Sequence, residues 1–120
     1  MAGPALTPEL ALDYLAELST DIRAGVLLDG DGSLAASWGG DDSRGERVRE
    51  LVVELMERAD AAAGERDRPS QVEVSTGAGG VFCVREGSWT IAVVTGRYAL
   101  ASLMFLDLRK LLEDLERSAA

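Results

Sequence analysis

The stretch from Gln71 to Thr95 constrains the fold more than any other part of the chain. Three strand-like segments follow one another there: "QVEVST" alternates polar and apolar residues, "GVFCVRE" is apolar with a polar end, and "WTIAVVT" is apolar almost throughout. The short links between them, "GAGG" and "EGS", carry glycine and favour β-hairpins. The stretch therefore predicts three consecutive antiparallel strands.

The part of the chain before residue 40 predicts a helix and two more strands. Thr7 suits the N-cap position and Pro8 the first helical position, so we expect a helix from Thr7 to about Asp21. Its apolar stripe comprises Ala11, Tyr14, Leu15, Leu18 and Ile22. Residues 25–28 and 33–38 predict a pair of short strands.

Two further helices are predicted. The sequence "SRGE" at Ser43–Glu46 is typical of a capping box, and Gly64 suits the end of the helix that begins there. The apolar face of this second helix comprises Val48, Leu51, Val52, Leu55, Met56, Ala59 and Ala63. From about Tyr98 to Arg117, apolar residues recur at helical spacing and predict a third helix.

The resulting order is helix, two strands, helix, three strands, helix. Residues 25–28 and 89–95 are apolar on both faces, so we expect these strands in the middle of a sheet, whereas the alternating strand 71–76 suits an edge. The predicted fold class is α+β, a three-layer α/β/α domain with a five-stranded antiparallel sheet. We expect residues 1–120 to form a single domain whose ends, 1–6 and 117–120, are loose.

Charge and composition narrow the possible functions. The net charge is −9 and Lys110 is the only lysine, which argues against binding to nucleic acid or to an anionic membrane. The chain has no histidine, so the commonest general base and the usual zinc sites are missing. Its one cysteine, Cys83, lies in an apolar strand and is expected to be a buried structural thiol. Nothing resembles a signal peptide or a membrane span, so we expect a cytoplasmic protein.

The segment "LLDGDGSL" allows two interpretations, a calcium loop or a hairpin turn. An EF-hand loop needs carboxylates at alternating positions, a central glycine and a final glutamate, and counting from Asp29 satisfies only the first two carboxylate positions. Asp-Gly is favoured in a type I′ turn, here with Asp31 and Gly32 central and Leu28 opposite Ala35. We therefore predict a hairpin, and we expect no metal site, no cofactor and no catalytic residue.

The strand 71–76 and the second helix together predict a surface for association. An edge strand presents unpaired backbone groups, and "QVEVST" has no proline or lysine to block pairing. The alternative is that the loop from Gly64 to Ser70 folds over this edge. The predicted dimer interface comprises Val48, Leu51, Val52, Leu55, Met56, Ala59, Val72, Glu73 and Val74.

Two further residues are candidates for contact with a partner. Trp38 ends a predicted edge strand and either caps the core or remains exposed as an interaction anchor. Arg97 precedes the third helix and is either a solvated loop cation or a contact for a phosphate group of the partner.

The chain resembles the roadblock/dynein light chain family. The segments that carry the resemblance are "GVLLDGDGSLAAS", "RVRELVVELMERADAAAG" and "WTIAVVTGRYALASLMFLDLRKLLEDL". The resemblance implies a roadblock/profilin-like fold and a homodimer or heterodimer paired through the second helix and third strand into one continuous sheet. Because bacterial relatives are partners or regulators of small Ras-like GTPases, it also implies a non-catalytic dimeric scaffold for such a GTPase.

A second class of function is compatible with the same order of elements. Ligand-binding sensor domains of the PAS and GAF kind also use a five-stranded antiparallel sheet flanked by helices. Such a domain needs an internal pocket with polar anchors on the face of the sheet. The predicted strands offer mostly Val, Ile, Leu and Ala, which indicates a filled core.

Overall fold

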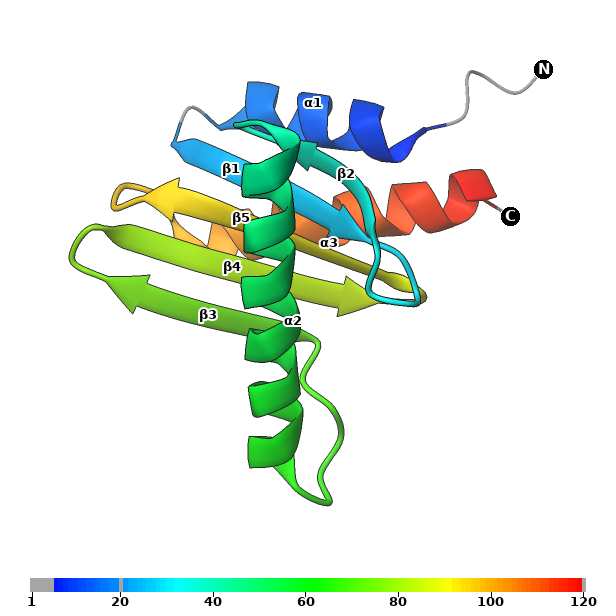
Figure 1. Cartoon of the computed structure of the whole chain (residues 1–120), viewed down its shortest axis with the longest axis vertical. Helices are drawn as coiled ribbons and strands as arrows, with labels where there is room; N and C mark the ends of the chain where they lie inside the picture. The colour runs from blue at the N-terminus through cyan, green and yellow to red at the C-terminus, as the bar shows by residue number, and fades with distance from the viewer. Residues whose placement is uncertain (1–5, 20, 120) are drawn as a thin grey trace.

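The computed structural model describes residues 6–19 and 21–119 and has the predicted order of elements (Figure 1). The helices are α1 (Pro8–Leu18), α2 (Asp42–Ala63) and α3 (Ala101–Ala119), and the strands are β1 (Ile22–Leu28), β2 (Leu34–Trp38), β3 (Gln71–Thr76), β4 (Gly79–Glu86) and β5 (Trp89–Gly96). The predicted α+β fold class is confirmed. Within the described residues, no helix is long and apolar enough to cross a membrane.

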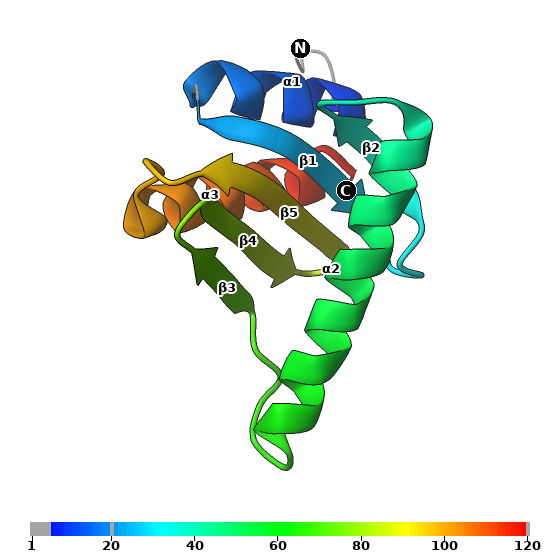
Figure 2. The same cartoon turned by 60° about the vertical axis from the view of Figure 1, so that its left-hand side comes forward.

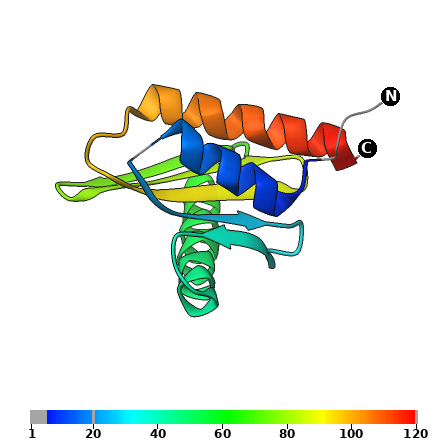
Figure 3. The same ribbon diagram turned by 90° about the horizontal axis from the view of Figure 1, so that it is seen from above.

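The five strands form one antiparallel sheet in the order β2-β1-β5-β4-β3. The helices α1 and α3 lie on one face and α2 crosses the other, so the domain has three layers (Figure 3). The placement of β1 and β5 inside the sheet and of β3 at its edge is as predicted. Both faces of β1 and β5 are apolar because each face is covered by a helix.

Two apolar clusters fill the space on either side of the sheet. Between the sheet and the α1/α3 layer, the side chains of Leu15, Leu27 and Leu108 are fully buried. On the opposite face, Val26 of β1 and Cys83 of β4 are buried together with side chains of α2. Burial raises the pKa of the Cys83 thiol to about 12, so this cysteine is an unreactive part of the core, as the sequence predicted.

The first helix is shorter than its apolar stripe predicted. Thr7 is the N-cap, and its Oγ1 accepts a hydrogen bond from the backbone N–H of Leu10 at 3.2 Å. The helix ends at Leu18 because Ser19 has extended backbone angles. The prediction that Ile22 belongs to the helix is wrong: Ile22 begins β1 and is buried there.

The second helix begins before the predicted capping box. Its N-cap is Asp41, whose Oδ1 accepts a hydrogen bond from the N–H of Arg44 at 2.8 Å. Ser43, the predicted cap, lies inside the first turn, where its Oγ accepts a hydrogen bond from Nη1 of Arg47. Both residues have cap-forming side chains, and the earlier one adds two residues to the helix. Gly64 is the C-cap with a φ of +62°, as expected.

The Asp-Gly segment is a turn, but not of the predicted type. Oδ1 of Asp29 accepts hydrogen bonds from the N–H groups of Asp31 at 2.9 Å and Ser33 at 3.1 Å. A type I′ turn needs positive φ at both central residues, whereas only Gly32 has one, +77°. A β-bulge between Leu27 and Leu28 shifts the register, so Leu28 pairs with Leu34 rather than Ala35. The Asp29 carboxylate is therefore used to close the turn.

The third helix starts later and ends later than predicted. Oδ2 of Asp21 accepts a hydrogen bond from the N–H of Tyr98 at 2.9 Å, which holds the link before the helix in a non-helical path. The helix runs to Ala119, so the expectation of a loose end is wrong for residues 117–119. Residues 1–5 and 120, which the same expectation included, lie outside the described residues.

Candidate protein-interaction surface

The strand β3 forms an open edge of the sheet. It pairs with β4 on one side, and five of its six residues are exposed. Val72 and Val74 lie on the face that α2 crosses, and Glu73 lies on the opposite face. The backbone groups along such an edge are available to a strand of another chain.

The loop that connects α2 to β3 leaves this edge uncovered. Residues 64–70 extend below the sheet with the end of α2 and return to the start of β3 (Figures 1 and 2). Ser70 then joins the sheet, since its carbonyl oxygen accepts a hydrogen bond from the N–H of Arg85 at 2.9 Å. The alternative, in which this loop folds over the edge, is wrong, because the loop does not run along β3.

The second helix crosses the sheet and extends past β3 (Figures 1 and 2). Val52 is fully buried and Met56 is 6% exposed, because both pack on the sheet. Both residues were predicted to lie in the dimer interface, but they belong to the core of the chain and offer almost no surface to a partner. Leu51, on the neighbouring flank of the helix, is 48% exposed.

The other residues of the predicted interface keep accessible surface. Val48, Leu55 and Ala59 of α2 and Val72 of β3 are partly exposed, and Leu51, Glu73 and Val74 are exposed. These residues extend along α2 from β1 and β2, where Val48 lies, toward the β3 edge, where Val72 packs against the same apolar cluster.

Beside α2, the uncovered face of β3, β4 and β5 forms a shallow trough of about 370 Å³. Its floor is made of small and apolar residues, and two arginines lie at its rim. The lining comprises Arg23, Arg44, Val74, Thr76, Ala78, Gly79, Gly80, Val81, Val94, Thr95 and Gly96. A side chain on Gly79 would collide with the backbone oxygen of Thr95, so glycine is needed for the strands to pack here.

The exposed flank of α2 faces this trough. Arg44 lines the trough, and Val48, Leu51 and Leu55 follow it at intervals of four, three and four residues, which places them on the same flank of the helix. The opposite flank, which includes Glu57, faces a separate cavity of about 260 Å³ next to the β1–β2 turn. The trough, the α2 flank and the β3 edge therefore form one continuous surface.

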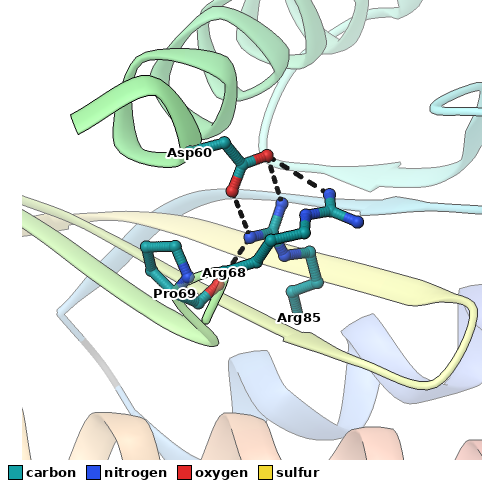
Figure 4. Close-up of polar contacts among 4 residues, drawn as sticks. All are labelled: Asp60, Arg68, Pro69 and Arg85. Carbon is teal, nitrogen blue, oxygen red and sulfur yellow. Dashed lines mark hydrogen bonds and ion pairs between the residues drawn. The ribbon is translucent and has the colours of Figure 1, made fainter. Parts of the chain in front are cut away.

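An ion-pair network fixes the part of α2 that extends past the sheet (Figure 4). Nη2 of Arg85, on β4, donates hydrogen bonds to Oδ1 of Asp60 and to the carbonyl oxygen of Pro69, both at 2.6 Å. Nη1 of Arg85 and Nη2 of Arg68 each donate to Oδ2 of Asp60 at 3.2 Å. These bonds, from Arg85 above all, lower the pKa of Asp60 to about 2.

Sequence reasoning did not single out Asp60 or Arg85, although a signal was present. Asp60 follows Val52 and Met56 at intervals of four residues, so a carboxylate continues the stripe that packs on the sheet. A charged residue in that position indicates an opposite charge beneath it. In the structure, Arg85 fills this space and is only 17% exposed.

The two other candidate contacts lie away from this surface. Trp38 is partly buried and packs against the cluster between the sheet and the α1/α3 layer, so most of its ring serves the core. Arg97 is exposed, and its guanidinium lies 5.1 Å from the ring centroid of Tyr98 and donates a hydrogen bond to the Tyr98 hydroxyl. The structure does not bring either residue to the β3 edge.

No protein-family model and no curated protein matches the sequence. Solved structures do match the fold. A Roadblock/LC7 domain from Streptomyces avermitilis superposes with a TM-score of 0.84 at 20% identity, covering 93% of this chain and 97% of its own. Myxococcus xanthus MglB has a TM-score of 0.76 at 14% identity, covering 89% and 83%.

An MglB with a tetrameric arrangement has a TM-score of 0.74 at 20% identity, covering 98% of this chain and 97% of its own. These three structures cover nearly the whole of this chain as well as most of their own, so the likeness extends over the complete domain rather than a shared motif. The fold implied by the sequence resemblance is thereby confirmed. The chain has the fold of the Roadblock/LC7 domains.

Proposed function

We propose that this protein is a non-catalytic, dimeric scaffold in the cytoplasm that binds and regulates a small Ras-like GTPase. The observation that carries the proposal is the open β3 edge, which continues into the trough and the exposed flank of α2. The sequence resemblance to roadblock proteins, together with the Roadblock/LC7 and MglB folds, supports this use of the surface.

The surface is suited to a second copy of the same chain. A two-fold axis beside β3 pairs the two β3 strands in antiparallel fashion and makes one sheet from both copies. The same axis brings the part of each α2 that extends past β3 toward the trough of the other copy, because this part of α2 and the trough lie on the same face of the sheet. An interface of standard size buries about 800 Å² on each partner.

The ion-pair network around Asp60 holds the part of α2 that extends past β3 in a fixed direction in the free protein. Three chain segments, α2, β4 and the loop before β3, meet at its carboxylate and at Arg85. A preorganised helix loses less conformational freedom on association. Asp60 and Arg85 thus support the proposed dimer without contacting the partner.

For the GTPase, the proposed role is that of a binding platform. We assign no residue of this chain to the chemistry of hydrolysis, so any effect on the rate comes from reshaping the GTPase on binding. The chain's net charge of −9 favours a partner with a basic contact surface.

The test uses calorimetry with the small Ras-like GTPases encoded in the same genome, each loaded with GDP or with a non-hydrolysable GTP analogue. We expect one of them to bind the wild-type protein with a preference for one nucleotide state. Leu55→Glu, which places a charge on the exposed α2 flank, should weaken this binding together with dimerisation. If no GTPase binds in either state, the proposed function is wrong.

No observation favours the alternative of a small-ligand sensor. Such a sensor needs an internal pocket between the sheet and a covering layer. Here the side chains of Leu15, Leu108 and Leu112 fill the space under the α1/α3 layer, and each is at most 2% exposed.

A further inference from the structure

A second surface lies on the opposite side of the sheet from α2. The helices α1 and α3 run antiparallel beside each other there (Figure 3). Between them is a groove of about 370 Å³. Tyr14 and Leu18 of α1 form one wall, and Asp107, Lys110 and Asp114 of α3 line the other.

Leu6, the first described residue, also lines the groove, and no other part of residues 6–19 and 21–119 covers its apolar wall. Leu15 and Leu111 at its base are 2% and 5% exposed, whereas Tyr14 and Leu18 are 54% and 50% exposed. Leu10, four residues before Tyr14, is 51% exposed, so three large apolar side chains recur along one stripe of the 11-residue helix α1. A row of this kind on a monomer's surface marks a place where another molecule packs.

The charges around the groove define the chemistry of that molecule. The helix α1 carries Glu9, Asp13 and Glu17 and has no lysine or arginine. Across the groove, Lys110 lies between Asp107 and Asp114, and Asp114 is paired with Arg117, so the unbalanced negative charge comes mainly from the α1 side. The rim is thus mainly acidic, and a partner with basic residues beside its apolar contacts is complementary to it.

The shape of the groove favours a helix as the occupant. Two neighbouring antiparallel helices leave a straight furrow, into which a third helix packs at an axis distance of about 8–10 Å. An amphipathic helix presents anchors at intervals of three and four residues, which match the spacing of Leu10, Tyr14 and Leu18.

We propose that the α1/α3 groove binds a cationic amphipathic helix of a partner protein, with its apolar face on Tyr14 and Leu18. This site goes beyond the proposed GTPase platform and does not depend on it. Because α2 and β3 lie elsewhere, a helix in the groove leaves the proposed dimer interface free. The protein then links two partners, one on each face of its sheet.

The test uses a synthetic helix of about 18 residues, roughly five turns, with leucines on one face and lysines on the other. It is titrated into the full chain by calorimetry. Two control peptides have the same leucine pattern with glutamate in place of lysine, and the same composition in a scrambled, non-amphipathic order. We expect the cationic amphipathic peptide to bind and both controls to bind at least about 10-fold more weakly.

Variants of the chain locate the site. Tyr14→Ser and Leu18→Ser should each weaken binding about 10-fold, which corresponds to about 1.4 kcal/mol. Leu100→Ser is the matched control, since Leu100 is 64% exposed and does not line the groove. Both wall residues are half-exposed, so their variants should keep the wild-type circular dichroism spectrum.

Nuclear magnetic resonance of the labelled protein gives an independent readout, with peptide-induced shifts expected in α1 and α3. The proposal is overturned if the control peptides bind as well as the cationic helix, or if the two wall variants bind it unchanged. It is also overturned if the shifts map to α2 and β3, or if the groove proves to be closed by a second copy of the chain.

Discussion

The two edges of the sheet are covered to very different extents. At one edge, the residues of β2 are buried or partly buried, with α1 on one face and the first turns of α2 on the other. At the opposite edge, five of the six residues of β3 are exposed. One helix, α2, passes over both edges, but it packs closely against β1 and β2 and much less closely against β3.

Side chains of different size lie under the two ends of α2. Near β2, Gly45 is buried, and a Cβ atom there would lie 2.8 Å from Oγ of Ser37, so the absence of a side chain allows close packing. Near β3, Asp60 and the long side chain of Arg85 act as a spacer between α2 and β4. The tilt of α2 thus covers one edge and leaves the other, with its trough, open.

The largest expected effect concerns the open edge. Val74→Lys places a flexible charge at the centre of the proposed strand pairing and should raise the dimer dissociation constant by about 100-fold or more, measured by sedimentation equilibrium. Leu103→Lys is the matched control, because Leu103 is 54% exposed on α3, away from β3. Equal dimer affinity in the two variants would contradict the assigned interface.

The second prediction tests the covered edge by placing a side chain in the close contact between α2 and β2. Gly45→Val forces a side chain against Ser37 and should lower the free energy of unfolding by about 1–3 kcal/mol in urea titrations. Ala62→Val makes a similar change on the exposed part of α2 and should cost about 0.5 kcal/mol or less. A Gly45→Val protein as stable as wild type would mean that close packing does not hold α2 at this edge.

A smaller effect distinguishes the two possible caps of α2 beside the covered edge. Asp41→Ala removes the acceptor of the Arg44 N–H and should lower the free energy of unfolding by about 1 kcal/mol. Ser43→Ala should cost only a few tenths of a kcal/mol, since its hydroxyl satisfies no backbone donor. If Ser43→Ala lowered the free energy of unfolding more than Asp41→Ala, in thermal or urea unfolding, Ser43 would be the N-cap instead.

The last prediction concerns the spacer at the open edge, whose effect depends on pH and disappears in acid. Because the pKa of Asp60 is lowered from 3.8 to about 2, its stabilisation is present above about pH 4 and is lost as the pH falls toward 2. Unfolding in urea should therefore show wild type and Asp60→Asn converging over this range. Parallel pH profiles for the two proteins would show that the Asp60–Arg85 pair does not act as assigned.

Much of the fold could be predicted from periodicity and turn residues. The strict alternation in β3 identified the edge strand, and the apolar runs of β1 and β5 identified central ones. The sequence alone could not show which of two suitable residues caps α2, since Asp41 and Ser43 both suit an N-cap. The same holds for the turn, where two successive Asp-Gly pairs allow more than one hairpin geometry.

The candidate surface was predicted only in part because it depends on tertiary placement. The apolar face of α2 is wide, and its sequence does not tell which residues pack on the chain's own sheet. The structure assigns Val52 and Met56 to the core and leaves Leu51 and Leu55 accessible. The trough arises where β3, β4 and β5 remain uncovered, and no local pattern encodes that relationship.

The central claim is that the open edge pairs with a second copy of this chain. The most direct measurement is the solution mass of the wild-type protein by light scattering over a wide range of concentrations. The account predicts twice 12.7 kDa, persisting on dilution, and a mass of 12.7 kDa for Val74→Lys. A wild-type mass of 12.7 kDa at every concentration would contradict it.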